Sequence, residues 1–135
     1  MRAGREDATV VVDCGRLDPN SPTVNLAVEA DCLLLCVRPR ADELAHLAAR
    51  LDIVRSWNAN LRLILIGGGY SPREIARELG PLTIDCLPHD PRVSGALTGP
   101  GCRPRRRFGT SLGAATEKLA VTLADLNVLG ESVAV

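Results

Sequence analysis

The residues best suited to chemistry come directly after runs of apolar residues that are typical of buried strands. Asp13 follows four β-branched residues, glycines 67–69 follow a second apolar run, and Pro88–Asp90 follows a third. In a parallel sheet the carboxyl ends of the strands meet at one edge, where loops and helix N-termini surround a crevice that binds ligands. We therefore expect these three groups at one ligand-binding edge. The alternative for Asp13 is that it only ends its strand and caps a turn.

A carboxylate at the end of a buried strand can hold Mg²⁺ through its water shell while the metal bridges nucleotide phosphates, which is the Walker B pattern. Its phosphate-binding partner, G-x-x-x-x-G-K-[ST], is absent from the sequence, whose single lysine is Lys118. Glycines 67–69 could offer N–H groups to a phosphate, but Pro72 removes one donor, and we expect a tight strand-to-helix turn with positive φ angles. We assign no catalytic residue. The alternative of a small enzyme that uses Cys14 and His89 lacks any nucleophile motif around either residue.

Composition restricts the classes of function. The chain has 135 residues, of which 46% are hydrophobic, so it can bury the core of one compact domain. Its 16 basic and 16 acidic residues balance, and aromatic residues make up only 2%, which argues against a nucleic-acid interface. The basic run Arg103–Arg107 is interpreted as part of a solvated, flexible loop over residues 99–108. The alternative is that this run binds nucleic acid or an acidic lipid surface.

The cysteines indicate a reduced protein. There are five, and three of them (Cys32, Cys36 and Cys86) lie inside apolar strand-like runs, so we expect buried free thiols in a cytoplasmic protein. No histidine or further cysteine completes a zinc set around Cys32 and Cys36. The sequence shows neither a signal peptide nor an apolar run long enough to span a bilayer.

The alternation of strands and helices predicts an α/β fold with a mostly parallel sheet and helices on both faces. It is assigned to residues 8–128, between an N-terminal extension (1–7) and a C-terminal tail (129–135). Strands are expected at residues 9–13, 32–37, 61–66 and 82–87. Helices are expected at 24–29, 41–57, 73–79, 92–97 and 109–127, the helix at 41–57 being amphipathic and continuous.

The order of these pieces resembles the C-terminal half of the MinD/ParA family of deviant-Walker (SIMIBI-class) P-loop ATPases. The resemblance covers about residues 8–127 and is carried by VVVDCG (10–15), EADCLLLCVRP (29–39) and RLILIGGGYSPREIARELGPLTIDCLPHDPRV (62–93). It implies part of a Rossmann-like, three-layer P-loop NTPase fold. It also implies a bacterial cytoplasmic protein of the cell-division or chromosome-partitioning type.

Carried over to this sequence, the resemblance makes Asp13 the acid that assists Mg²⁺ placement. It also places Pro88 and Asp90 in the loop that lines the nucleotide base. Gly67 stands where many members have an asparagine that reads adenine, and Arg38–Pro39 matches the turn after the next core strand. These positions imply ATP and Mg²⁺ as cofactors only if a phosphate-binding loop is supplied elsewhere.

Family members carry that loop upstream, on a central strand, whereas Met1 lies only a few residues before the first predicted strand. A carboxylate without the loop repels a triphosphate, so we expect no ATP hydrolysis by this chain alone. An open sheet edge would favour a homo-oligomer or a protein partner that supplies strands. The alternative function is accordingly a non-catalytic interaction module that docks through this edge or through the Arg103–Arg107 loop.

Overall fold

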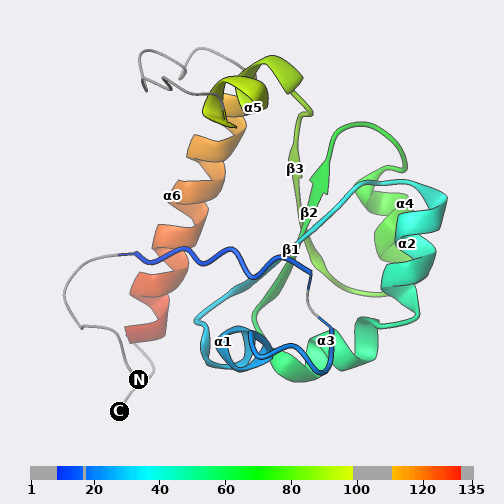
Figure 1. Cartoon of the computed structure of the whole chain (residues 1–135), viewed down its shortest axis with the longest axis vertical. Helices are drawn as coiled ribbons and strands as arrows, with labels where there is room; N and C mark the ends of the chain where they lie inside the picture. The colour runs from blue at the N-terminus through cyan, green and yellow to red at the C-terminus, as the bar shows by residue number, and fades with distance from the viewer. Residues whose placement is uncertain (1–8, 17, 99–110, 132–135) are drawn as a thin grey trace.

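The structure, a computed structural model, describes residues 9–16, 18–98 and 111–131. Within these residues it shows an α/β fold built around a parallel sheet of three strands in the order β1-β2-β3 (Figure 1). The strands are β1 (Leu33–Val37), β2 (Leu61–Ile66) and β3 (Thr83–Leu87). The predicted parallel sheet is confirmed for these strands, two of which begin one residue later than expected.

Helices connect and flank the strands. They are α1 (Val24–Glu29), α2 (Ala41–Ala48), α3 (Leu51–Trp57), α4 (Pro72–Leu79), α5 (Pro91–Thr98) and α6 (Ser111–Glu131). The predicted helices at 24–29 and 73–79 are confirmed, and α5 and α6 differ from prediction only in their bounds. In the described ranges, no helix combines the length and apolar character needed to cross a bilayer.

The continuous helix predicted over residues 41–57 is wrong, because the chain breaks between α2 and α3. The N–H of Arg50 donates to Leu47 O at 3.0 Å, three residues back, and Arg50 has a φ of −119°. The tightened turn leaves Leu47 and Leu51 both buried against the sheet. The apolar spacing that suggested one helix is therefore kept across two shorter ones.

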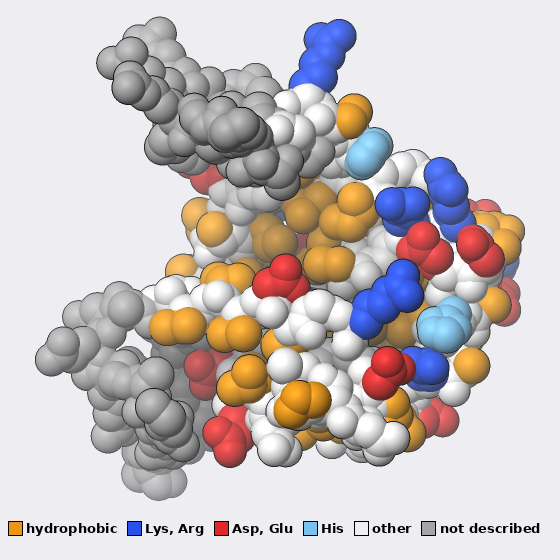
Figure 2. All heavy atoms as spheres, in the orientation of Figure 1, with side chains coloured by type: hydrophobic (Ala, Val, Ile, Leu, Met, Phe, Trp, Pro, Cys, Tyr) orange, Lys and Arg blue, Asp and Glu red, His pale blue; other side chains and the backbone are white. Residues whose placement is uncertain are grey.

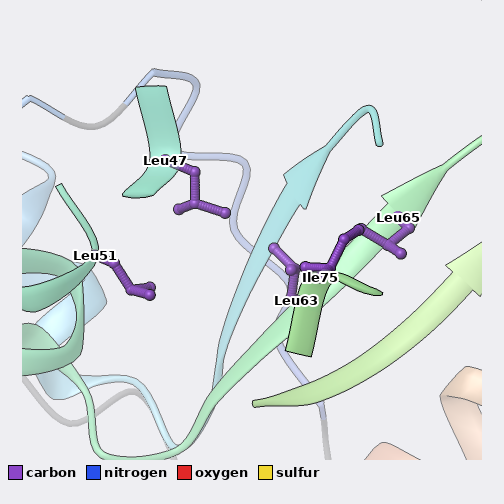
Figure 3. Close-up of a cluster of buried hydrophobic side chains, with 5 residues drawn as sticks. All are labelled: Leu47, Leu51, Leu63, Leu65 and Ile75. Carbon is purple, nitrogen blue, oxygen red and sulfur yellow. The ribbon is translucent and has the colours of Figure 1, made fainter. Parts of the chain in front are cut away.

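The main core lies on one face of the sheet (Figure 3). Leu63 and Leu65 project from alternate positions of β2 and meet Leu47, Leu51 and Ile75 from the covering helices. Side chains two apart on a strand share a face, which is why the LRLILI run contributes its leucines to this core. Each fully buried leucine contributes about 1.5–3 kcal/mol to stability.

The opposite face carries α6, which contacts β3 and stands across the sheet from α2 and α4 in Figure 1. Here Arg62 of β2 is buried and donates to Asp85 of β3 from Nε at 3.0 Å and from a terminal nitrogen at 2.8 Å. On α6, Leu112, Ala115, Leu119 and Thr122 are half-buried. Val121, next to Thr122, is exposed.

A capping box fixes the start of α4. The Ser71 hydroxyl accepts from the N–H of Glu74 at 3.3 Å, and a Glu74 carboxylate oxygen accepts from the N–H of Ser71 at 2.8 Å. The hydrogen bonds from Ser71 favour the charged form of Glu74 and lower its pKa. Pro72 occupies the first turn, where its missing N–H costs nothing.

The strand predicted at residues 9–13 is wrong. These residues form no strand, and Val10, Val11 and Val12 are 70%, 84% and 54% exposed. Four β-branched residues have high strand propensity, but a strand also needs a neighbour, and β1 pairs only with β2 among the described residues. The run is therefore extended and unpaired.

The expectation of buried thiols is wrong for Cys36 and Cys86, which are exposed, while Cys14 and Cys32 are half-buried. All four are free cysteines. The predicted basic loop 99–108, Cys102 and the N-terminal extension 1–7 lie outside the described residues. Of the predicted tail, residues 129–131 belong to α6 and the remainder is not described.

Candidate functional site

Two of the three predicted site segments meet at the carboxyl edge of the sheet. The N–H of Gly67, just after β2, donates to Leu87 O at the end of β3 at 2.8 Å. A Cβ on Gly67 would lie 3.2 Å from the Cβ of His89. The glycine turn and the Pro88–Asp90 segment are therefore neighbours, as predicted.

A cleft of about 200 Å³ opens at this edge. It is lined by Ile66, the last residue of β2, and by residues that follow all three strands: Arg38, Arg40, Gly67, Gly68 and His89. Figure 2 shows basic side chains and histidines, in blue and pale blue, gathered on one part of the visible surface with acidic side chains among them. The location agrees with the general rule that ligands bind beyond the carboxyl ends of parallel strands.

The glycine turn is held against the turn that follows β1. The N–H of Tyr70 donates to Pro39 O at 2.9 Å, and a Cβ on Gly69 would overlap that same carbonyl group. Gly67 has a φ of +81°, which confirms the predicted positive-φ turn. The two turns that form the cleft are thus fixed relative to each other by close backbone contact.

Asp90 caps α5. Its Oδ1 atom accepts from the N–H groups of Arg92 and Val93, both at 3.1 Å. A carboxylate in this position satisfies free N–H groups at the helix start. Pro88 is half-buried beside it. The loop implied to line a nucleotide base is therefore ordered by its own helix cap.

Asp13, the third predicted site, does not line the cleft. It is exposed, and its Oδ1 accepts from the N–H of Gly15 at 2.9 Å, which is the turn-capping role weighed above. The carboxylate nevertheless lies close enough to Cys36 of β1 to affect it. Although the Cys36 side chain is exposed, partial desolvation by the surrounding protein is the main cause of the raised pKa of its thiol, and the charge of Asp13 adds to it.

The residues that the resemblance links to Mg-ATP do not all meet at the cleft, since Gly67 lines it and Asp13 does not. Among the described residues, no group of three His, Cys, Asp or Glu side chains could hold a metal ion. Lys118 is exposed on α6, and Gly67 has no side chain with which to read a base. Of the two residues considered for a small enzyme, His89 lines the cleft and Cys14 does not.

Sequence reasoning missed Arg38 and Arg40 as candidate site residues, since the segment was interpreted only as the turn after a strand. The signal was present in the sequence. Both arginines directly follow an apolar run whose carboxyl end had to lie at the same edge as Gly67 and His89. What the sequence did not show is that Pro39 packs under the glycine turn and brings the two loops together.

A larger hollow of about 340 Å³ lies at the opposite edge of the sheet, lined by residues that include Arg55 and Asn58. Its donors are already used. Arg55 donates to Leu79 O at 3.0 Å, where it caps the end of α4, and Asn58 donates to Ala27 O at 2.9 Å. These contacts hold helices in place, so we assign no ligand site there.

No protein-family model matches this chain, and neither a curated protein nor a solved structure matches it significantly.

Proposed function

We propose that this chain is a MinD/ParA-like domain of the cell-division or chromosome-partitioning type that does not hydrolyse ATP by itself. We further propose that it associates with a second copy through the open edge of β1. The family part rests on the order of motifs and on the parallel strands whose loops meet at one edge. The association part rests on a single observation, the unpaired edge of β1 beside an exposed apolar segment.

The hydrogen-bonding groups of that edge are unused within the described part of the chain. Leu33 N–H donates to Asn60 O at 3.1 Å, toward β2. Because N–H groups alternate in direction along a strand, those of Leu34 and Cys36 point to the other side. An edge of this kind is a template for another strand.

The exposed valines add an apolar surface. Val10–Val12 precede Asp13, whose carboxylate acts on Cys36 of β1, so the segment enters the fold next to this strand. Figure 2 shows hydrophobic side chains, in orange, at the surface along the stretch that Figure 1 colours blue. Each exposed valine that becomes fully buried gains about 1.5 kcal/mol or more. Pairing of two β1 edges would cover the unused hydrogen-bonding groups of the strand and the exposed valines together.

The proposed lack of ATP hydrolysis follows from the charges at the carboxyl edge. Asp13 is the only residue that the resemblance links to Mg²⁺, and Lys118, the single lysine, lies on α6. Asp90 matches the loop that lines the base, but its Oδ1 is used as a helix cap. Hydrolysis needs positive groups held around the triphosphate beside Mg²⁺, and neither Asp13 nor Lys118 lines the cleft that Arg38 and Arg40 line.

Light scattering coupled to size-exclusion chromatography tests the association. We expect a dimer fraction that rises with concentration and falls strongly in Val11→Lys, which places a charge on the apolar segment. Val28→Lys is the matched control, because Val28 is half-exposed on α1, and it should leave the dimer fraction unchanged. Hydrogen exchange should slow at the Leu34 and Cys36 amides as the dimer forms.

A wild-type chain that stays monomeric at every concentration, with fast exchange at these two amides, would overturn the association. ATP hydrolysis is measured on the same sample. Mg-dependent turnover that is lost in Asp13→Ala would overturn the other half of the proposal.

A further inference from the structure

Three hydrogen-bond donors in the cleft have no partner among the residues that the structure describes. They are the guanidinium of Arg40, the ring of His89 and the N–H of Gly68, and all three residues line the same hollow. Arg38 contributes a second guanidinium to its wall. Donors that line one hollow without an acceptor can form a site for an anion.

The neighbouring acids compensate this positive charge only in part. Glu43 lies near Arg38, with 3.9 Å between the guanidinium Nε and a carboxylate oxygen. The other Glu43 oxygen accepts from the Arg38 backbone N–H at 2.8 Å, so this acid mainly holds the turn. Asp90 directs Oδ1 to the N–H groups at the start of α5. Arg40 therefore keeps its charge available to the cleft.

The start of α2 adds to this field. The helix begins at Ala41, directly after Arg40, and no side chain caps it. The first turn of such a helix carries partial positive charge, which the acids Asp42 and Glu43 offset in part. The contribution reinforces the arginines and is not needed for the argument.

The cleft is fixed in shape before any ligand arrives. Gly67 is hydrogen-bonded to Leu87, and Tyr70 is hydrogen-bonded to Pro39, so the turns that carry Gly68 and the arginines are joined by backbone contacts. A site whose donors are held in place loses less entropy on binding.

The size of the cleft limits its ligand. Its volume of about 200 Å³ is below the range of about 300–1,000 Å³ that is typical of sites for whole small molecules. A tetrahedral phosphate group fits such a space, and paired arginines match its oxygens well.

We propose that Arg38, Arg40, Gly68 and His89 form a binding site for a phosphate group, either inorganic phosphate or the phosphate end of a small monoester. Arg40 supplies the main charge, Gly68 a backbone donor and His89 a ring donor. This inference goes beyond association through β1, because the cleft lies at the carboxyl edge of the sheet, and it requires neither Mg²⁺ nor hydrolysis.

NMR titration of the full chain in a chloride buffer tests the site. Inorganic phosphate and AMP should both shift the Gly68 amide and saturate, whereas adenosine should not. Saturation by phosphate and AMP alike identifies the phosphate group as the shared ligand, and tighter binding of AMP would identify a monoester as the better one. Increasing salt should weaken both, because the site is exposed and charged.

Arg38→Ala and Arg40→Ala should each weaken phosphate binding by about fivefold. Arg77→Ala is the matched control, since it removes an exposed charge from the last turn of α4, outside the cleft, and it should bind as the wild type does. The melting temperature of each variant shows that it is folded. The inference fails if phosphate does not saturate Gly68, if adenosine binds as well as AMP, or if Arg40→Ala and Arg77→Ala bind alike. Each of these results is independent of whether the chain dimerises.

Discussion

Gly69 lies directly against the backbone carbonyl of Pro39, so that any Cβ at position 69 would overlap it. This contact joins the turn after β2 to the turn after β1. It is the reason why Arg38, Arg40 and Gly68 come to line one cleft.

Gly69→Ala should therefore destabilise the fold by about 2 kcal/mol or more, because backbone must move to admit the methyl group. Gly68→Ala is the control next to it, since a Cβ there meets nothing within 4 Å. That change should alter the free energy of unfolding by less than about 0.5 kcal/mol. Urea denaturation compares the two, and equal losses would show that the turns are not in contact.

Asp85→Ala should leave Arg62 charged and unpaired inside the fold. The side chains of the pair are only 10% and 30% exposed, and we expect a loss of about 2–3 kcal/mol in the free energy of unfolding. Glu78→Ala breaks the Arg77–Glu78 pair, whose side chains are 76% and 74% exposed, and should cost less than about 0.5 kcal/mol. If both changes cost the same in chemical denaturation, the Arg62–Asp85 pair is not buried in solution.

The pKa of the Cys36 thiol predicts how alkali acts on the fold. Partial desolvation and Asp13 raise this pKa above its ordinary value of 9.0, so in alkali the unfolded chain loses the proton before the folded chain does. The contribution of the protonated Cys36 thiol to the free energy of unfolding is therefore fully present below pH 9.0. It is lost as the pH rises through the pKa of the thiol in the folded chain. Asp13→Asn should lower the pKa of the Cys36 thiol and so reduce the loss of stability in alkali.

Alkylation rates, read for each cysteine by mass spectrometry, check the same relationship because the thiolate is the reactive form. Asp13→Asn should speed the reaction of Cys36 by about twofold at mildly alkaline pH. Asp31→Asn is the control, since Asp31 raises the pKa of Cys32. Asp31→Asn should speed the alkylation of Cys32 and leave the alkylation rate of Cys36 unchanged. If the alkylation rate of Cys36 is the same in Asp13→Asn as in the wild type, Asp13 does not lie close to β1.

Most of the elements could be predicted from the sequence because their signals are local. Apolar runs such as Leu61–Ile66 specify buried strands, and Ser71, Pro72 and Gly80 specify the bounds of α4. The break between α2 and α3 could not be predicted. Leu47 and Leu51 have the spacing of one helix, and only their packing on the sheet shows that two helices satisfy it.

The failure at residues 9–13 has a different cause. Thr9–Val12 has the propensity of a strand, but a strand exists only as one side of a ladder, and its neighbour is decided by the whole sheet. The cleft was missed for a similar reason. Arg38 and Arg40 lie about 50 residues before His89, and the contact between Pro39 and Gly69 that joins their loops leaves no mark in the sequence beyond the glycine itself.

The sheet ends in an unpaired strand on both sides, β1 at one and β3 at the other, within the residues described. Two molecules that join β1 to β1 about a twofold axis form a closed particle and stop growing. Molecules that join β1 of one to β3 of the next leave a fresh edge after every addition, and such an assembly grows into filaments. A charge introduced by Val11→Lys should oppose both routes, because this exposed segment, which belongs to no strand, enters the fold next to β1.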